Sequence, residues 1–225
     1  MNPPDPSHKM SPAGKPLRME PLTRSWQRSW QALQAAPAAG LFEQLVACYE
    51  EPHRRYHTLL HLGECIERLG PVLGLAGYPG EVEVALWFHD AVYDPRRQDN
   101  EAQSALWARQ ALESAGLPGE ALSRVESLIM ATRHSVLPET PDECLLVDVD
   151  LSILGSAPAR FAEYEAQVRE EYDWIPGAQF RHRRAAILEG FLGRAAIYRT
   201  EHFLRLYEAQ ARKNLERSLR ILQMK

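Results

Sequence analysis

The chain has 225 residues, of which 45% are hydrophobic and 25% are charged, so it is able to bury a core without disulfides. Its formal net charge of −4 argues against a general nucleic-acid binder. The sequence holds no apolar stretch of the roughly 20 residues that cross a membrane, and the N-terminus has no secretory signal pattern. We therefore expect a cytoplasmic protein without a membrane partner.

The 3 cysteines are widely spaced and form no CxxC pair. This pattern excludes a disulfide framework and a cysteine-based zinc site. Positive charge gathers at the C-terminal end, where residues 181–225 contain 11 Lys or Arg against 4 Asp or Glu. Such asymmetry either marks a surface that attracts an anion or is a solvated helical face.

Residues 1–21 contain six of the 16 prolines and almost no periodic apolar pattern. Proline removes backbone donors and the segment has little to bury, so the sequence predicts a disordered leader over 1–21. Met10 and Met19 lie inside this leader and are alternative translation starts to Met1.

From Leu22 onward, apolar residues recur at spacings of three and four, which is typical of helices. After two such repeats around Trp26 and Leu45, the expected helices span 58–69, 81–92, 100–115, 119–134, 142–154, 159–172 and 179–224, the last one broken near Thr200. Segments rich in glycine and proline separate them, and alternating strand patterns and internal repeats are absent from the sequence. The sequence predicts an all-α fold, one helical domain over 22–225.

A first chemical signal is the dipeptide His89-Asp90, which follows the apolar run 82–88. A histidine and an aspartate beside core residues are costly to bury without a partner. A divalent cation is such a partner, because imidazole and carboxylate are both good ligands. By itself the dipeptide is weak, since it occurs by chance in many proteins.

A second signal is the pair His57 and His61, whose four-residue spacing predicts that both imidazoles lie on one helix face. The pair resembles half of a zincin motif. Thr58, however, stands where a zincin requires its catalytic glutamate, which argues against a metalloprotease. A pair of surface histidines is the alternative interpretation.

A third signal is the pair Asp148 and Asp150 inside the apolar stretch 145–154. Buried carboxylates are expensive unless they are paired or coordinated. The alternative is a helix N-terminal turn in which one aspartate caps the backbone.

The order of these signals, His61 then His89-Asp90 then Asp150 on three separate helices, resembles the HD superfamily of metal-dependent phosphohydrolases. More narrowly, the chain is similar to a bacterial subgroup of predicted phosphohydrolases within that superfamily. The matching segments are RYHTLLHL (55–62), FHDAVYDP (88–95), DNEAQSA (99–105), DVDLSILG (148–155) and RAAIYRTEHF (194–203). The resemblance covers about residues 22–220 and implies an HD-type helical bundle.

The resemblance implies a divalent metal ion (Mn, Zn, Fe, Co, Ni or Mg) held by four side chains: His61, His89, Asp90 and Asp150. His61 is preferred to His57 because the family's first ligand opens a helix that continues with small or apolar residues. Asp150 is preferred to Asp148 because the family's aspartate is the second of a D-x-D pair. His57 and Asp148 then support the ligands from outside or bind a second metal.

The activity implied by the resemblance is hydrolysis of a small phosphate ester or nucleotide by a metal-activated water. The expected catalytic residues are Glu101, His57 and His134. Arginines near the motifs are expected to bind the substrate phosphate, namely Arg54, Arg55, Arg96, Arg97 and Arg133. The alternatives are solvent-facing arginines and a helix-capping role for Glu101.

Two other functions stay open from the sequence. Some enzymes of this fold hold two irons and use oxygen, and further ligands for such a site are present in His57, His134 and Asp148. A non-catalytic ligand-binding or scaffold protein is the third interpretation. The sequence identifies neither the substrate nor the metal, and it leaves a homodimer possible.

Overall fold

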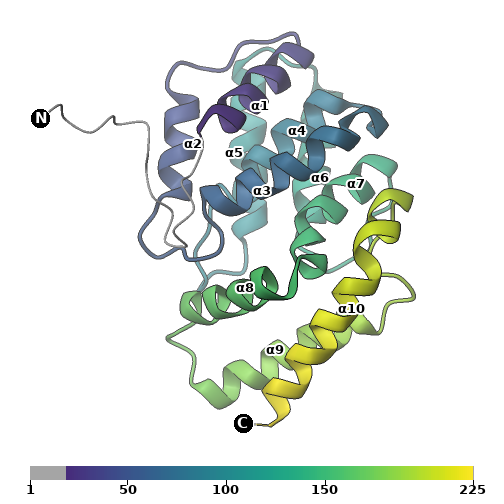
Figure 1. Cartoon of the computed structure of the whole chain (residues 1–225). Coiled ribbons are helices and arrows are strands. Elements are labelled where there is room, and N and C mark those ends of the chain that lie inside the picture. Colours follow the sequence, from purple (N-terminus) through teal and green to yellow (C-terminus); the bar gives the residue numbers. More distant parts are fainter. Residues whose placement is uncertain (1–18, 225) are drawn as a thin grey trace, which may run out of the picture. The chain divides into compact units, whose positions relative to one another are not determined.

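The computed structural model describes residues 19–224, and this part of the chain contains ten α-helices, two 3-10 helices and no strand (Figure 1). The predicted all-α fold is therefore confirmed. The helices group into two compact units, divided between Leu137 and Pro138, and each unit is described by itself. The single domain expected over 22–225 stays a prediction.

The predicted leader falls mostly on residues 1–18, outside the described part of the chain. Its boundary was placed too late, because helix α1 begins at Met19 and ends at Ala32. Pro21 fits into this helix since the first turn has no intrahelical partners for its N–H groups.

Helix α4 (Pro79–Phe88) is the central helix of the first unit, and it packs against α1, α3, α5 and α6. All nine residues from 80 to 88 are buried, and apart from two glutamates they carry no charge, as expected for a helix without a solvent-facing side. Gly80 allows close packing on α1, because a Cβ there would lie 3.0 Å from the Cβ of Ala32. The other helices of this unit are α2 (Leu41–Tyr49), α3 (Leu59–Leu69), α5 (Asn100–Ser114) and α6 (Gly119–Ala131), with the 3-10 helix η1 (Gly70–Leu75) after α3.

Two buried glutamates of α4 are each satisfied by a neighbouring helix. Glu81 accepts two hydrogen bonds of 2.7 Å from Arg124 of α6. Glu83 accepts from Ser25 Oγ at 2.6 Å and from Arg28 Nε at 2.9 Å, both on α1. These pairs fix α1 and α6 against α4, and the local sequence pattern does not reveal them.

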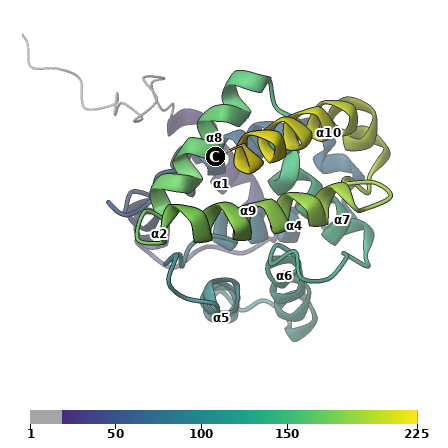
Figure 2. The same cartoon turned by 90° about the horizontal axis from the view of Figure 1, so that it is seen from below.

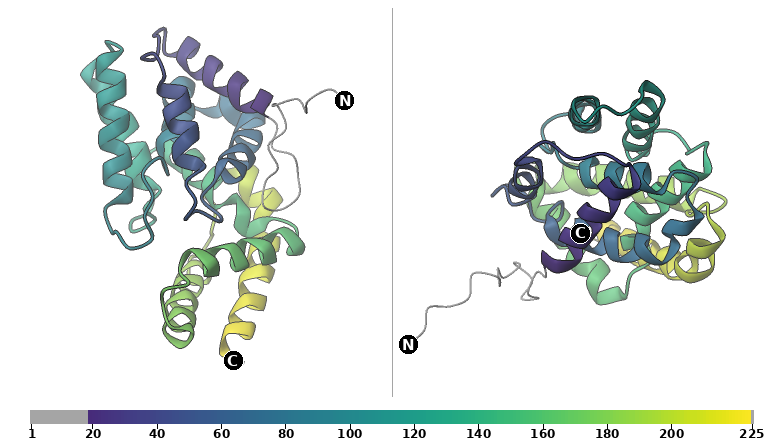
Figure 3. Two further views of the ribbon diagram at one scale, coloured as in Figure 1. Left: turned by 90° about the vertical axis from the view of Figure 1, so that its left-hand side faces the viewer. Right: turned by 90° about the horizontal axis from the view of Figure 1, so that it is seen from above.

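Helices α5 and α6 form an antiparallel pair that packs on α4, seen side on and end on in Figure 3.

Two helices of this unit end earlier than the sequence predicts. Helix α4 ends at Phe88 instead of 92, and the following loop is anchored to α5, where Ser104 Oγ accepts from Val92 N at 3.0 Å. Helix α6 ends at Ala131, and His134 has a left-handed backbone with φ 57°, which cannot continue a helix.

The second unit consists of α7 (Pro141–Asp150), η2 (Leu151–Gly155), α8 (Pro158–Glu171), α9 (Gly177–Leu192) and α10 (Glu201–Gln223). Helix α10 packs on α9 and η2, and Figure 2 shows α8, α9 and α10 together. The predicted break near Thr200 is confirmed, because α9 ends at Leu192 and α10 begins at Glu201.

The segment 194–203 serves packing in this unit. Tyr198 is fully buried and its hydroxyl donates to Leu151 O at 3.0 Å, while Phe203 is also fully buried. Gly155 allows close approach of α10, since a Cβ there would lie 2.6 Å from the Cβ of Tyr207.

All three cysteines are free thiols, with Cys65 buried and Cys48 and Cys144 half-buried. Within residues 19–224, every helix is too short or too polar to span a bilayer.

We expect Glu83→Gln to lower the free energy of unfolding by about 2 kcal/mol, because it removes the charge-assisted bonds to Arg28 in a buried setting. Urea titration followed by circular dichroism measures this loss. The matched control is Glu120→Gln, whose side chain is 92% exposed and 3.9 Å from Arg124, and a change below about 0.5 kcal/mol is expected. Equal effects of the two variants would contradict the role given to Glu83.

Candidate metal centre

Three side chains of the first unit converge on one point. His61 lies in the first turn of α3, and His89 and Asp90 follow directly after α4. His89 Nε2 lies 3.0 Å from Asp90 Oδ2 and 3.3 Å from His61 Nε2, and His61 Nε2 lies 3.6 Å from Asp90 Oδ2. The two imidazoles are 1–2% exposed, whereas the side chain of Asp90 is 17% exposed. The cluster is thus buried except at its carboxylate.

The ring of His89 is oriented by the helix that precedes it. Its Nδ1 lies 2.7 Å from Leu86 O, and because a carbonyl oxygen only accepts, Nδ1 carries the hydrogen. Nε2 is then the nitrogen that faces the carboxylate oxygen of Asp90. Two acceptors this close require a positive species between them, either a proton or a metal cation.

The separations fit a metal cation. Ligand atoms about 2.1 Å from a shared cation are about 3.0 Å apart at right angles and about 3.4 Å apart at the tetrahedral angle. Two of the observed separations, 3.0 and 3.3 Å, lie in this range, and the third, 3.6 Å, is slightly longer than the tetrahedral value. His61, His89 and Asp90 therefore form a group that is able to hold a metal ion.

The charge state of Asp90 suits this role. Burial by itself would raise the pKa of Asp90, but the nearby imidazoles of His89, His57 and His61 outweigh it and hold that pKa below its usual range. Asp90 is accordingly a carboxylate, the ligand form, at neutral pH.

Arg54 fixes the turn that carries His89 and Asp90. Its Nη1 donates to Asp90 O at 2.7 Å and to His57 O at 3.1 Å, and its Nη2 donates to Ala91 O at 3.0 Å. Nε and Nη2 each lie 3.0 Å from a carboxylate oxygen of Glu51. Four N–H donors of the guanidinium are thereby hydrogen-bonded, Nη2 also forms an ion pair with Glu51, and the side chain is 0% exposed.

The expectation that Arg54 binds a substrate phosphate is therefore corrected. Its position before the first histidines suggested a phosphate contact, but the fold directs its guanidinium inward onto backbone carbonyls. The guanidinium also lies over the rings of Tyr49 and Tyr93, 5.3 and 5.4 Å from their centroids. This arginine positions the candidate metal centre.

His57 lies beside the cluster but not on helix α3. The helix begins at Leu59 with Thr58 as its N-cap, so the prediction of two imidazoles on one helix face is wrong. The His57 ring nevertheless lies 6.0 Å from the His61 ring and stacks on Tyr93 at 4.1 Å. Cys65 also contacts the cluster, which the sequence patterns did not indicate: its Sγ lies 3.6 Å from His61 Nδ1.

Glu101 lies in the first turn of α5, which is tied to the loop after Asp90. Asn100 makes this connection, because its Oδ1 accepts from Asp94 N at 3.2 Å and its Nδ2 donates to Asp94 O at 2.9 Å. The start of α5 is therefore held against the loop that leaves the cluster.

The other arginines expected to bind phosphate are exposed: Arg55, Arg96, Arg97 and Arg133. Arg97 donates two hydrogen bonds of 2.7 and 2.8 Å to Asp99, and these bonds, with one from Gln103, lower the pKa of Asp99 to about 2. Phosphate binding by these four residues, and catalysis by His134, stay predictions.

In the second unit, Asp150 is the last residue of α7, and its assignment as a metal ligand stays a prediction from the sequence.

The fully buried Asp148 has a structural role in the second unit. Its carboxylate accepts from Thr200 N and Thr200 Oγ1 at 2.7 Å and from Arg199 N at 2.9 Å. Burial raises the pKa of Asp148 despite these bonds. The sequence suggested that Asp148 supports a metal ligand or a second metal, whereas the fold uses it to anchor the start of α10.

Comparison with known proteins gave no match: no family model, no curated protein and no solved structure matches this chain. The class of protein that the fold and the site define is an all-helical protein with a candidate His/Asp metal centre.

We expect Arg54→Met to lower the free energy of unfolding by about 3 kcal/mol, because buried carbonyl groups and Glu51 lose their donors. Metal affinity should fall about tenfold or more, since the turn bearing two ligands is loosened. Urea titration and calorimetric metal titration measure the two effects.

The neighbouring variant Arg55→Met is the matched control, because the Arg55 side chain is exposed. Arg54→Lys, which keeps the charge and part of the bonding, should fall between wild type and Arg54→Met. Wild-type stability and affinity in both Arg54 variants would show that the guanidinium does not position the cluster.

Proposed function

We propose that this protein is a metal-dependent phosphohydrolase of the HD superfamily, acting on a small phosphate ester or nucleotide. The observation that carries the proposal is the convergence of His61 Nε2, His89 Nε2 and Asp90 Oδ2 within 3.0–3.6 Å of one another. The ordered motifs of the sequence support the family, and the fixed orientation of His89, with Nε2 directed at Asp90, is the one that a metal ligand requires.

The residues that would hold the metal are His61, His89 and Asp90, joined by Asp150 as the fourth ligand predicted from the sequence. When bound, a divalent ion supplies a Lewis acid for a phosphoryl oxygen and an activated water at neutral pH. Two imidazoles and carboxylates accept several divalent ions, so the donor set does not select one of them.

Side chains of the protein itself would exclude solvent, donate a proton and position the water and the phosphate. The buried imidazoles keep solvent from the inner side of the cluster, and the partly exposed Asp90 marks the side on which a substrate approaches. His57 stacks on Tyr93 near this side and is the candidate proton donor for the leaving oxygen. Glu101 is the candidate for orienting the water, and the exposed Arg55 and Arg96 are candidates for the phosphate.

The test compares metal content and phosphate release in wild type and Asp90→Ala. We expect near-stoichiometric metal and manganese-dependent phosphate release in the wild type, and loss of both in the variant, because Asp90 is the only negative ligand of the triad. Elemental analysis of the purified protein and a phosphate-release screen with phosphate esters and nucleotides measure these quantities. Asp173→Ala, at an exposed acid, is the control that should keep both.

Other results would assign the other functions. Two irons per chain without phosphate release would favour the oxygenase. Bound metal with no turnover of any substrate would favour a binding or scaffold protein. A folded wild type that binds no divalent ion would refute the metal centre itself.

Glu101→Gln should lower kcat about 100-fold while the metal content stays at the wild-type level, because the residue acts on water and is not a ligand. Steady-state phosphate release combined with elemental analysis separates the two quantities. Glu113→Gln, at an exposed position on the same helix, is the matched control. Loss of metal in Glu101→Gln would make Glu101 a ligand, and an unchanged kcat would leave it as a helix-terminal acid.

A further inference from the structure

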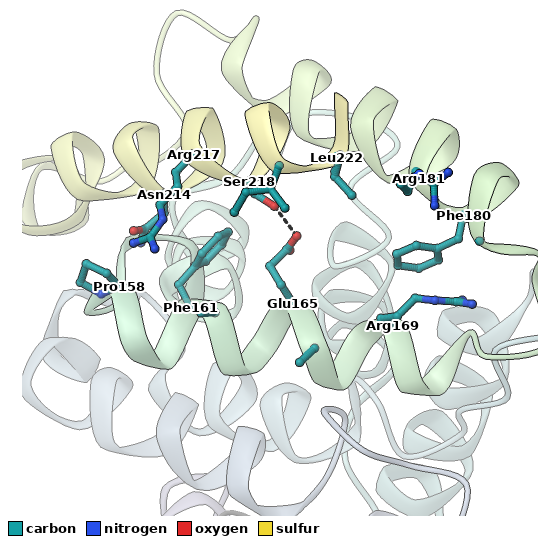
Figure 4. A pocket seen from close by; sticks show the side chains of 14 residues that line it. Pro158, Phe161, Glu165, Arg169, Phe180, Arg181, Asn214, Arg217, Ser218 and Leu222 are labelled. Atoms are coloured by element: carbon teal, nitrogen blue, oxygen red, sulfur yellow. Dashed lines mark hydrogen bonds between the residues drawn. The ribbon is translucent and has the colours of Figure 1, made fainter. Parts of the chain in front are cut away.

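The second unit contains a cavity of about 510 Å³ between α8, α9 and α10 (Figure 4). This volume lies within the range of small-molecule sites, about 300–1,000 Å³. Much of its lining is apolar, including Phe161 and Ala166 of α8, Phe180 of α9 and Leu222 of α10. The residues that line it belong to this unit alone, so the cavity is independent of the candidate metal centre.

Two helix faces form opposite walls of the cavity. Helix α8 presents Phe161, Glu165 and Arg169 at four-residue spacing, which places them along one face. Helix α10 presents Asn214 and Ser218 at the same spacing, and Figure 4 shows the two rows facing each other. The walls therefore follow from the helical repeat of these two segments.

The polar groups of these walls are satisfied by the protein. Glu165 pairs with the buried Arg184 and also accepts from Ser218 Oγ at 2.5 Å. Asn214 donates to Leu154 O and Ser156 O, both at 2.8 Å. The negative charge of Glu165 is thus neutralised by Arg184, and the walls do not repel an anion.

Three arginines that line the cavity have no carboxylate partner among residues 19–224: Arg169, Arg181 and Arg217. Arg169 uses two of its donors on Tyr172 O and Ile175 O, at 2.5 and 3.0 Å, and lies 4.7 Å from the centroid of the Phe180 ring. Figure 4 shows Arg169, Arg181 and Phe180 together at one end of the cavity, with Arg217 near Asn214 toward the other. Part of the positive excess of residues 181–225 is therefore directed at an apolar cavity.

We propose that this cavity binds an amphipathic organic anion. Its acidic headgroup contacts Arg169 and Arg181, and its apolar body lies along Phe161, Ala166 and Leu222. Guanidinium groups recognise carboxylate and phosphate oxygens through paired N–H donors, and both headgroups share this chemistry. The apolar walls exclude a bare inorganic anion as the preferred ligand, because it would leave them without contacts.

The test uses calorimetric titration of the full chain with dodecanoate and dodecyl phosphate, each below its micelle concentration, and with uncharged dodecanol below its solubility limit. The anions should bind with a stoichiometry of one, and dodecanol about tenfold more weakly or worse, because it cannot pair with the arginines. Tighter binding of one anion than of the other identifies the carboxylate or the phosphate as the preferred headgroup.

Variants separate the headgroup end from the apolar body. Arg181→Gln should weaken dodecanoate binding about tenfold, whereas Arg183→Gln, on the same helix but outside the cavity, should leave it unchanged. Ala166→Trp should abolish binding by filling the space. Arg181 is half-buried and makes no ion pair with the described residues, so its variant should fold, which circular dichroism verifies.

Three results would overturn the proposal. The first is a folded wild type that binds neither anion. The second is equal binding of dodecanol and dodecanoate with no effect of Arg181→Gln. The third is a dimer in sedimentation analysis that Ala166→Trp dissociates, which would make the cavity a contact between two copies of the chain.

Discussion

The burial of helix α4 on every side is the constraint on which the first unit depends. A helix without a solvent face must give each of its polar groups a partner, because an unsatisfied group costs about 1–3 kcal/mol. Glu81 is paired with Arg124 and Glu83 with Arg28, so the same bonds that satisfy α4 also fix α1 and α6 around it. Directly after α4, the buried His89 likewise requires partners for its ring nitrogens.

The candidate metal centre follows from the same requirement that buried polar groups have partners. His89 satisfies one ring nitrogen on its own helix, at Leu86 O, and directs the other toward Asp90 and His61. Arg54 holds the backbone of the turn through the carbonyls of Asp90 and Ala91. The three candidate ligand atoms are therefore oriented by the folded protein itself, which would limit the conformational entropy that metal binding must overcome.

The buried charged residues of the second unit also have partners within the protein. Asp148 closes the start of α10, and Arg184 neutralises Glu165 between α8 and α9. Because Glu165, the acid that lines the cavity, is neutralised by Arg184, the arginines around the cavity keep their positive charge available to a ligand. A cavity with apolar walls and uncompensated cations is selective for anions that carry an apolar body.

The sequence by itself determined the all-α fold, most helix positions and the break near Thr200, because helical periodicity is visible locally. The expectation that His61 joins His89 and Asp90 came from the order of the motifs in the resemblance, since these residues lie 28 positions apart. Only the tertiary structure decided the role of Arg54, whose partners at Asp90 and Ala91 lie 36 and 37 residues away. It likewise gave Asp148 to the backbone of α10, 51 and 52 residues away, and ended α4 at Phe88. A side chain's partner across such distances depends on how helices pack, and local spacing contains no record of it.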